Sequence, residues 1–405
     1  MKIDDKTSHN SPSIRFPEFT GEWEKCKLGT LATKVGSGST PKGGDAVYTS
    51  IGHYFVRSQN VGMGFLMLDN IAHINDDIHQ KHKATEIYEN DVLLNITGAS
   101  IGRTAVATKE LEGGNVNQHV CIIRTNSKVN PKFLCDYIQT QRIQNHIKSL
   151  QTGGSREGLN FEQIRSFPIS LPSINEQNKL TCLLDKINER IATQVRLIDR
   201  LQSLIKGINR TIFTGSGLEY SLCDVCEIRS GYSGNQLQGG KGLGVSRIET
   251  ISAHNINLER IGYVAPFDAS ENYRLQVGDI LFSNINSVEY IGNTAFIDKD
   301  YNLYHGMNLL RLIPFRNVVV PFYLYILLNT NRMLKHFKTI CNKAVSQASI
   351  NQKELGKTIV MLPSLEKQKQ VCNIYQAMYS KLKTEKDVLS FYQEQKRYLL
   401  RHMFI

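Results

Sequence analysis

Short clusters of polar and basic residues, of the types that read the edges of DNA bases, recur in both halves of this sequence. Arginine, glutamine and asparagine are the side chains that pair bidentately with guanine or adenine in the major groove, and hydroxyl residues add phosphate contacts. Any one such residue is more often part of an ordinary solvated loop, so the prediction of DNA binding depends on the whole set. The candidate positions are Arg57, Ser58, Gln59, Asn60, Thr97, Ser100, Arg103 and Arg156 in the first half, and Arg229, Lys241, Arg247, Asn284, Asn286 and Gln347 in the second.

Motifs for catalysis or metal binding are incomplete in the sequence. Residues 239–242, Gly-Gly-Lys-Gly, lack the hydroxyl residue that follows the lysine of a phosphate-binding loop. Cys223 and Cys226 have the spacing of a metal site, but no second cysteine pair or histidine cluster follows them. Residues 79–83 hold two histidines and two lysines, which indicates a solvated basic loop. We therefore expect a chain with no catalytic residues and no metal or cofactor of its own.

Composition indicates a soluble globular protein with a polyanionic partner. The 405 residues are 41% hydrophobic, which suits two or three domains, and no apolar run is long enough to span a bilayer. Lysine and arginine exceed aspartate and glutamate by 48 − 37 = 11, an excess that favours binding to nucleic acid. Eight cysteines are too few for a disulfide scaffold, and the polar N-terminus does not resemble a signal peptide. The expected location is the cytoplasm, with no membrane contact.

A repeat of 191 residues organises the elements that position these loops. From Asn175 to Phe213, apolar residues recur at alternating steps of four and three, the pattern of a long helix that packs against another helix. Adding 191 to each position gives the same register near the C-terminus, with Gln194 and Glu385 at equivalent places inside the seam. The positions expected to pair the two helices are Leu184, Ile187, Ile191, Gln194, Ile198 and Leu201 in the first copy, and Met378, Leu382, Glu385, Leu389 and Tyr392 in the second.

Two helices of equal length and register predict an antiparallel coiled coil within one chain. Each would span roughly 58 Å at about 1.5 Å per residue, and antiparallel pairing would give the chain pseudo-twofold symmetry. The alternative is that the helices are separate dimerisation elements of a homo-oligomer. Outside them, short strand patterns alternate with a helix predicted from Pro131 to Leu150 and its counterpart from Pro321 to Lys338, which indicates duplicated α/β (α+β) domains.

The repeat gives five segments along the chain. They are an N-terminal arm (1–20), a first domain (21–172), a central helix (173–214), a second domain (215–363) and a C-terminal helix (364–405). The element order is the same in both domains while the loops differ freely, so we expect two equivalent domains that recognise two different things.

The helix starts carry a recognisable motif. Leu171-Pro172-Ser173 precedes Glu176-Gln177, and Leu362-Pro363-Ser364 precedes Lys367-Gln368. Together with the run Arg15-Phe16-Pro17-Glu18-Phe19 before Trp23, the run Gly98-Ala99-Ser100-Ile101-Gly102, and Asn117-Gln118, the pattern resembles the specificity subunit of type I restriction-modification enzymes over nearly the whole chain. The second copy departs from the family pattern at Tyr304-His305, where Asn117-Gln118 has no counterpart, and at Lys367 in place of Glu176.

The resemblance implies two target recognition domains that each read one half of a split site in double-stranded DNA. It also implies that the long helices hold two methyltransferase subunits and that motor-nuclease restriction subunits join for cleavage. S-adenosylmethionine, ATP and Mg would then belong to those partners, and this chain would be a non-catalytic subunit. The alternative is a coiled-coil scaffold with two protein-binding domains, whose affinity would respond weakly to salt, whereas phosphate contacts make affinity fall steeply with salt.

Overall fold

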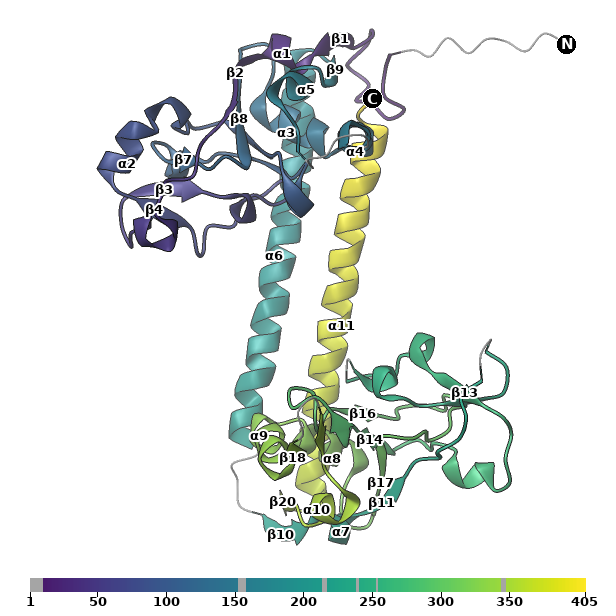
Figure 1. Cartoon of the computed structure of the whole chain (residues 1–405). Coiled ribbons are helices and arrows are strands. Elements are labelled where there is room, and N and C mark those ends of the chain that lie inside the picture. Colours follow the sequence, from purple (N-terminus) through teal and green to yellow (C-terminus); the bar gives the residue numbers. More distant parts are fainter. Residues whose placement is uncertain (1–9, 152–157, 213–216, 238–239, 253, 344–346) are drawn as a thin grey trace, which may run out of the picture. The chain divides into compact units, whose positions relative to one another are not determined.

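The computed structural model describes residues 10–151, 158–212, 217–237, 240–252, 254–343 and 347–405 (Figure 1). The chain divides into two compact units, one made of residues 1–195 with 387–405 and the other of residues 196–386. Each unit contains one of the two repeated domains and parts of both long helices, α6 (Ile174–Ile212) and α11 (Leu365–His402). The predicted helix from Asn175 to Phe213 therefore begins within one residue of α6, and its predicted last residue, Phe213, lies outside the described residues.

The first unit is built around an antiparallel four-stranded sheet in the order β2-β8-β5-β6. A second sheet has the order β4-β3-β7, and β1 pairs with β9 beside the start of α6. The strands of this unit are β1 (Glu24–Lys27), β2 (Ala32–Ser37), β3 (His53–Val56), β4 (Ala72–Ile74), β5 (Val92–Asn95), β6 (Thr104–Val106), β7 (Asn115–Val116), β8 (Val120–Thr125) and β9 (Pro168–Leu171). Its shorter helices are α1 (Leu28–Leu31), α2 (Asp76–Lys81), α3 (Pro131–Gln139), α4 (Gln141–Gln151) and α5 (Phe161–Arg165).

The second unit repeats the four-stranded sheet in the order β11-β17-β14-β16. Here β10 pairs with β20 as β1 does with β9, β12 pairs with β13, and a small sheet has the order β15-β19-β18. The strands are β10 (Leu218–Ser221), β11 (Cys226–Ser230), β12 (Leu243–Val245), β13 (Gly262–Val264), β14 (Ile280–Phe282), β15 (Ile285–Asn286), β16 (Thr294–Phe296), β17 (Leu310–Pro314), β18 (Asn342–Lys343), β19 (Ala348–Ser349) and β20 (Ile359–Leu362). The helices are α7 (Leu222–Val225), α8 (Pro321–Leu328), α9 (Asn331–Ile340) and α10 (Gln352–Gly356).

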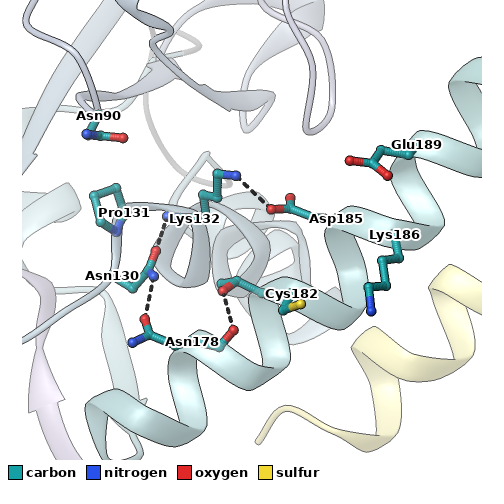
Figure 2. A pocket seen from close by; sticks show the side chains of 10 residues that line it. Asn90, Asn130, Pro131, Lys132, Asn178, Cys182, Asp185, Lys186 and Glu189 are labelled. Atoms are coloured by element: carbon teal, nitrogen blue, oxygen red, sulfur yellow. Dashed lines mark hydrogen bonds and ion pairs between the residues drawn. The ribbon is translucent and has the colours of Figure 1, made fainter.

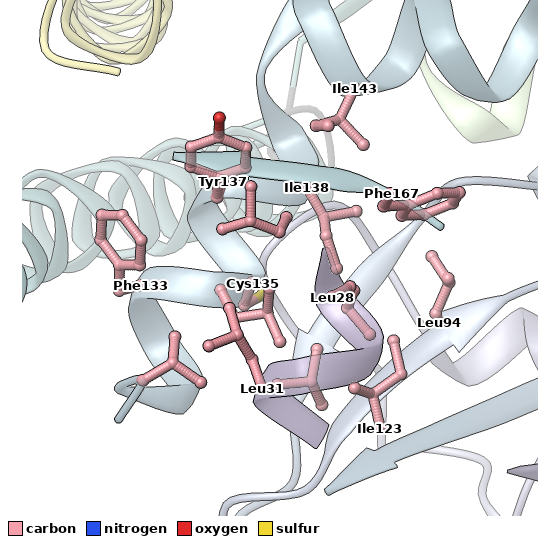
Figure 3. Packing of buried hydrophobic residues seen from close by; sticks show 14 of the residues in the cluster. Leu28, Leu31, Leu94, Ile123, Phe133, Cys135, Tyr137, Ile138, Ile143 and Phe167 are labelled. Atoms are coloured by element: carbon pink, nitrogen blue, oxygen red, sulfur yellow. The ribbon is translucent and has the colours of Figure 1, made fainter. Parts of the chain in front are cut away.

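Both faces of each four-stranded sheet are covered, which explains why its central strands are apolar without alternation. In β5, Val92 and Leu94 enter the core formed with the helices, whereas Leu93 enters a second core on the other face. The same division holds for Ile280 and Leu281 in β14. Figure 3 shows the helix-side core of the first unit, where residues of α1, α3 and α4 pack on the sheet. A strand buried on both faces reads as a continuous apolar run.

The predicted single helices from Pro131 and from Pro321 are wrong, because each is two helices divided at a threonine. Thr140 has extended backbone, and its hydroxyl donates a hydrogen bond to Tyr137 O at 2.7 Å while accepting one from the Ile143 N–H at 3.5 Å. Thr330 does the same, donating to Leu327 O at 2.8 Å. A threonine hydroxyl competes for backbone groups and so favours a helix boundary over a helix interior.

One buried glutamine joins each domain to the start of its long helix. Gln177 donates from Nε2 to Pro172 O at 2.9 Å and Lys128 O at 3.1 Å, and its Oε1 accepts from the Asn130 N–H at 2.8 Å. Gln368 makes the same three bonds, to Pro363 O, Val318 O and the Val320 N–H. The Leu-Pro-Ser…Gln motif is therefore a joint between helix and domain.

The neighbouring departure, Glu176 in one copy and Lys367 in the other, reflects the N-terminal arm. Arg15 donates from Nε to one oxygen of the buried Glu176 carboxylate at 2.7 Å and from Nη2 to the other at 2.8 Å. The Ile14 N–H donates to His402 O at 3.0 Å, so the arm lies against the end of α11. Lys367 is exposed on its helix. The first copy therefore has a carboxylate at this position, because the N-terminal arm supplies an arginine that pairs with it.

Within the first unit, α6 and α11 are antiparallel. Leu180 and Leu184 of α6 share a core with Leu400 and Met403 of α11, and further along α6 the Arg190 guanidinium lies 6.0 Å from the ring centre of Tyr392. Residue numbers thus increase along α6 in the direction in which they decrease along α11, which defines an antiparallel pair. None of the helix-pairing positions predicted from the sequence is exposed in either copy. The individual partners of those positions stay a prediction.

Candidate nucleic-acid interface

Two candidate arginines occupy the same place in the two domains. Arg57 follows β3 and begins a 3₁₀ turn, Ser58–Asn60, and Arg247 follows the equivalent strand β12 and begins the turn Ile248–Ile251. The Arg57 N–H donates to Asn60 Oδ1 at 3.0 Å, and the Arg247 N–H donates to Thr250 Oγ1 at 2.9 Å. A side chain three residues on therefore fixes the backbone of each arginine, as at a helix N-terminus.

The two arginine side chains differ in their surroundings. The guanidinium of Arg57 is 5.2 Å from the ring centre of Tyr48, and its Nε is buried without a hydrogen-bond partner among the described residues. Arg247 is exposed, with Nε 3.7 Å from the Glu249 carboxylate. Stacking on an aromatic ring holds a guanidinium in one plane while its outer nitrogens stay available, which is the geometry that bidentate recognition of guanine needs.

Asn60 uses both ends of its amide inside the domain, and the base-reading role stays a prediction. It is 3% exposed, and besides accepting from Arg57 it donates from Nδ2 to Met67 O at 2.9 Å. In the second domain the Thr250 hydroxyl donates to Arg260 O at 2.7 Å in the same way. Of the neighbouring candidates, Gln59 is exposed and Ser58 is half-buried.

The turn after β5 carries Thr97, Ser100 and Arg103 and is tied to the Arg57 turn. Asn95, the last residue of β5, donates from Nδ2 to Ser58 O at 2.8 Å. Arg103 is exposed, whereas Thr97 and Ser100 are half-buried. One end of the sheet therefore brings together candidates that lie about forty residues apart in the sequence, as expected for residues that contact one ligand.

A chain of polar side chains that the prediction missed extends this edge. Thr97 Oγ1 lies 2.6 Å from His119 Nδ1, His119 Nε2 lies 3.0 Å from Gln118 Nε2, and Gln118 bonds to Thr40. Gln118 belongs to the Asn117-Gln118 motif, which is the sequence signal that marks this loop. In the second domain, the segment before β17 carries Tyr304-His305 instead. Burial lowers the pKa of His305 to about 4, so this ring is neutral near pH 7.

The remaining candidates of the second domain differ in their exposure and in the bonds that they already make. Lys241 and Gln347 are exposed, and exposed Arg229 is paired with Glu227, Nε to carboxylate oxygen at 2.6 Å. Asn284 donates to Ile350 O at 3.3 Å, and Asn286 donates to Ser283 Oγ at 3.0 Å. Arg156 lies outside the described residues.

Each domain has an ion pair between a buried aspartate and an arginine of the four-stranded sheet, but the arginine occupies a different position along its strand in the two domains. The buried Asp91 carboxylate accepts from Arg124 of β8 at 2.8 Å, and the Asp279 carboxylate accepts from Arg311 of β17 at 2.8 Å. The register aligns Arg311 with Ile122, so the second arginine comes from the same face two residues earlier along its strand. The bond to Asp91 raises the pKa of Arg124, which stays charged.

The prediction of a solvated basic loop at residues 79–83 is wrong for its first histidine. His79 is 2% exposed, its ring stacks on His53 with centroids 3.8 Å apart, and its Nδ1 lies 2.8 Å from Asn115 Oδ1. Residues 79–81 lie in the last turn of the helix α2, in which His79 is buried.

Metal-binding geometry is not found among the described residues, where no three His, Cys, Asp or Glu side chains are grouped to hold an ion. Burial raises the pKa of Cys226 to about 12, so its thiol stays protonated, while Cys223 is exposed. Within the same described ranges, no helix is both long and apolar enough to span a bilayer.

A pocket lined mostly by polar side chains lies next to the long helix α6. It is a cavity of about 650 Å³ between the start of α3 and the first half of α6. Figure 2 shows side chains that line it. Asn130 donates from Nδ2 to Asn178 Oδ1 at 2.8 Å on its wall, and Lys132 pairs with Asp185 at 2.7 Å. The cavity is open and polar, a surface feature of the joint between helix and domain.

The repeated α+β domain with its two equivalent arginine turns corresponds to a known family. A family model described as "Type I restriction modification DNA specificity domain" matches residues 20–203 and again residues 218–390. The chain belongs to this family and carries its domain twice. The two matched regions cover both recognition domains and most of both long helices.

Relatives and solved structures agree with that family. A stretch of 187 residues is 38% identical to the proposed MjaX type I restriction enzyme specificity subunit of Methanocaldococcus jannaschii, covering 45% of this chain and 44% of that protein. The EcoBI specificity subunit of Escherichia coli is 24% identical over 167 residues, 40% of this chain and 34% of that protein. Each match spans less than half the length of the curated relative.

Similarity to solved structures extends over nearly the whole fold. The S subunit of a type I restriction-modification system from M. genitalium has a TM-score of 0.62 at 16% identity, covering 98% of this chain and 99% of that one. A chain solved to explain complex assembly and conformational transition of the type I R-M system has a TM-score of 0.59 at 19% identity, covering 93% and 96%. At these identities the likeness concerns the fold.

Proposed function

We propose that this chain is the DNA sequence-recognition subunit of a type I restriction-modification complex. Its two recognition domains each read one half of a bipartite site in double-stranded DNA. The observation that carries this proposal is the equivalent placement of Arg57 and Arg247, whose backbones the same hydrogen bond fixes in two domains with different loops. A shared turn that holds one arginine among variable loop residues suits two domains that recognise different DNA sequences.

The proposal includes the partners that such a subunit needs. The long helices bind two methyltransferase subunits, and motor-nuclease restriction subunits join the assembly for cleavage. S-adenosylmethionine, ATP and Mg act in those partners, and this chain supplies recognition without catalysis. The excess of basic over acidic residues supports a polyanionic ligand.

The test combines a genomic and a biochemical measurement. Sequencing of methylated adenines in cells with and without this gene should reveal one bipartite motif that depends on the chain. In the complex, Arg57→Ala and Arg247→Ala should each lose about 1–3 kcal/mol of discrimination at one base pair, in different half-sites. Lys25→Ala is the matched control, since Lys25 is an exposed cation on β1, away from β3 (Figure 1).

The salt dependence of binding separates the possible outcomes. A uniform loss of affinity for all sequences, with a shallower salt slope, would make the arginine a phosphate contact. If the chain binds its partners with little dependence on salt and no methylation motif depends on it, DNA recognition is contradicted and a protein-binding scaffold is favoured.

A further inference from the structure

A buried polar cluster joins α3 to the C-terminal end of α11 in the first unit. The Asp136 side chain is on α3, and the residue is 5% exposed. Gln139 donates from Nε2 to Asp136 Oδ1 at 3.2 Å, and its Oε1 accepts from Lys396 Nζ on α11 at 3.0 Å. The glutamine amide thus bridges a carboxyl group and an ammonium group that are far apart in the sequence.

A loop covers part of this cluster. Gly64 passes directly over it, because a Cβ on Gly64 would lie 2.8 Å from Gln139 Oε1 and 3.2 Å from Lys396 Nζ. The Gly64 N–H donates to Thr104 O at 2.7 Å, which holds the loop on the domain. Burial raises the pKa of Asp136 to about 7, while the Lys396 ammonium opposes that shift. A buried carboxyl group in such a place depends on its neighbouring cation.

The second copy has isoleucine at both charged positions. Helices α3 and α8 begin at prolines that are 321 − 131 = 190 residues apart, so Asp136 corresponds to Ile326. The long helices repeat at 191 residues, so Lys396 corresponds to Ile205. Ile326 is 3% exposed and Ile205 is 7% exposed. Both positions therefore differ together, with ionisable side chains in one unit and buried isoleucines in the other.

We propose that Asp136 and Lys396 form a docking pair that determines which helix end the first domain accepts. The Asp136–Gln139 face of α3 accepts the α11 end, which carries lysine, and rejects the otherwise repeated α6 end, which carries isoleucine. The reverse mismatch, with Lys396 against Ile326, is rejected for the same reason. In one mismatch the buried Asp136 carboxyl group loses its neighbouring cation, and in the other the half-buried Lys396 ammonium loses its polar partners. Removing one member of a polar pair costs more than replacing both members by apolar residues.

The wrong partner that this pair excludes is a second copy of the chain. Within one molecule, the residues of α6 from 196 onward already belong to the second unit. The α6 end of another molecule is free of that restriction, and exchange of repeated elements between copies is an easy route to oligomers. The docking pair thus keeps a duplicated chain from assembling with itself.

The experiment uses the full chain, refolded from denaturant at equal concentrations and examined by native mass spectrometry. Asp136→Ile with Lys396→Ile gives both domains apolar positions. We expect this double variant to be folded, with an oligomeric fraction raised by about two orders of magnitude over wild type. Adding Ile205→Lys and Ile326→Asp moves the charged pair to the second unit, and this matched control should return the oligomeric fraction to the wild-type level.

The single variants test the pair itself. Lys396→Ile alone should lower the thermal unfolding midpoint more than the double variant does, because it leaves Asp136 buried without its cation. If the single variants do not fold, Lys396→Met and Asp136→Asn, alone and combined, test the same order with smaller changes. Additive losses would overturn the pairing, and a double variant as monomeric as wild type would overturn the role in partner selection.

Discussion

Removing the amide of Gln177 should loosen the joint between the first domain and α6 without affecting the second unit. Gln177 is fully buried and serves three backbone groups, the Asn130 N–H, Lys128 O and Pro172 O. Gln177→Met keeps the length and apolar stem of the side chain and removes all three bonds. Gln368→Met is the equivalent change in the second unit.

The magnitude follows from the burial of the three partners. The bond to Pro172 O is buried, so its loss leaves an unsatisfied carbonyl at a cost of about 1–3 kcal/mol. The bonds to Lys128 O and Asn130 N are partly buried, so water replaces them and each loss costs about 1 kcal/mol. The sum is about 3–5 kcal/mol. All three bonds of Gln368 are partly buried, so its variant should lose less.

Hydrogen exchange resolved by segment measures this effect, since a single unfolding free energy is not defined for a chain of two units. In Gln177→Met, exchange around Asn130 and the first turns of α6 should accelerate by about two orders of magnitude or more, while residues near Val320 keep their rates. Asn178→Ala, which removes only an exposed bond to Asn130, is the control and should change exchange little. Acceleration below about threefold, or equal changes in both units, would refute the joint.

Three further predictions concern single positions. Burial raises the pKa of Asp136 from its ordinary 3.8 to about 7, so the folded chain holds a proton there that the unfolded chain releases. The stability of the first unit should therefore fall as pH rises from about 4 through 7. Asp136→Asn should flatten that slope in unfolding midpoints measured across this range. Glu176→Gln should release the N-terminal arm, read as faster proteolysis near residue 15, whereas the exposed Lys367→Gln should not; equal cleavage of wild type and Glu176→Gln would contradict this. Gly38→Ala should destabilise the first domain, because its Cβ would lie 1.7 Å from Val116 O, and an unchanged unfolding midpoint would show that the loop relaxes freely.

The repeat of the long helices was predictable from sequence because helix periodicity is a local property. The seam of apolar residues predicted the start of α6 to within one residue, and the repeated motif located the joints at Gln177 and Gln368. The breaks at Thr140 and Thr330 were not predicted, because a threonine inside an apolar pattern ends a helix only when its hydroxyl finds a backbone partner. Similarly, residues 79–83 have the composition of a loop, and only the ring of His53 explains why His79 is buried.

The candidate interface was predictable by residue type but not by role. Sequence reasoning placed Arg57 and Arg247 in one set with Asn60, since all three side chains suit base edges. Their surroundings differ, because the hydrogen bonds of Asn60 are used within its own domain. The equivalence of the two arginines was hidden, because Asn60 and its counterpart Thr250 are different residues that do the same work with different atoms.

That substitution explains how one frame serves two readers. In each domain the third residue of the turn fixes the arginine backbone and then reaches a later carbonyl, Met67 O in the first domain and Arg260 O in the second. The loop between that residue and its acceptor spans 67 − 60 = 7 positions in one domain and 260 − 250 = 10 in the other. The arginine is therefore held by the strand and the turn, while the loop is free to change in length and composition. A duplicated domain with this division keeps its fold while its two copies acquire different loops, and in the proposed function each loop determines a different half of the site.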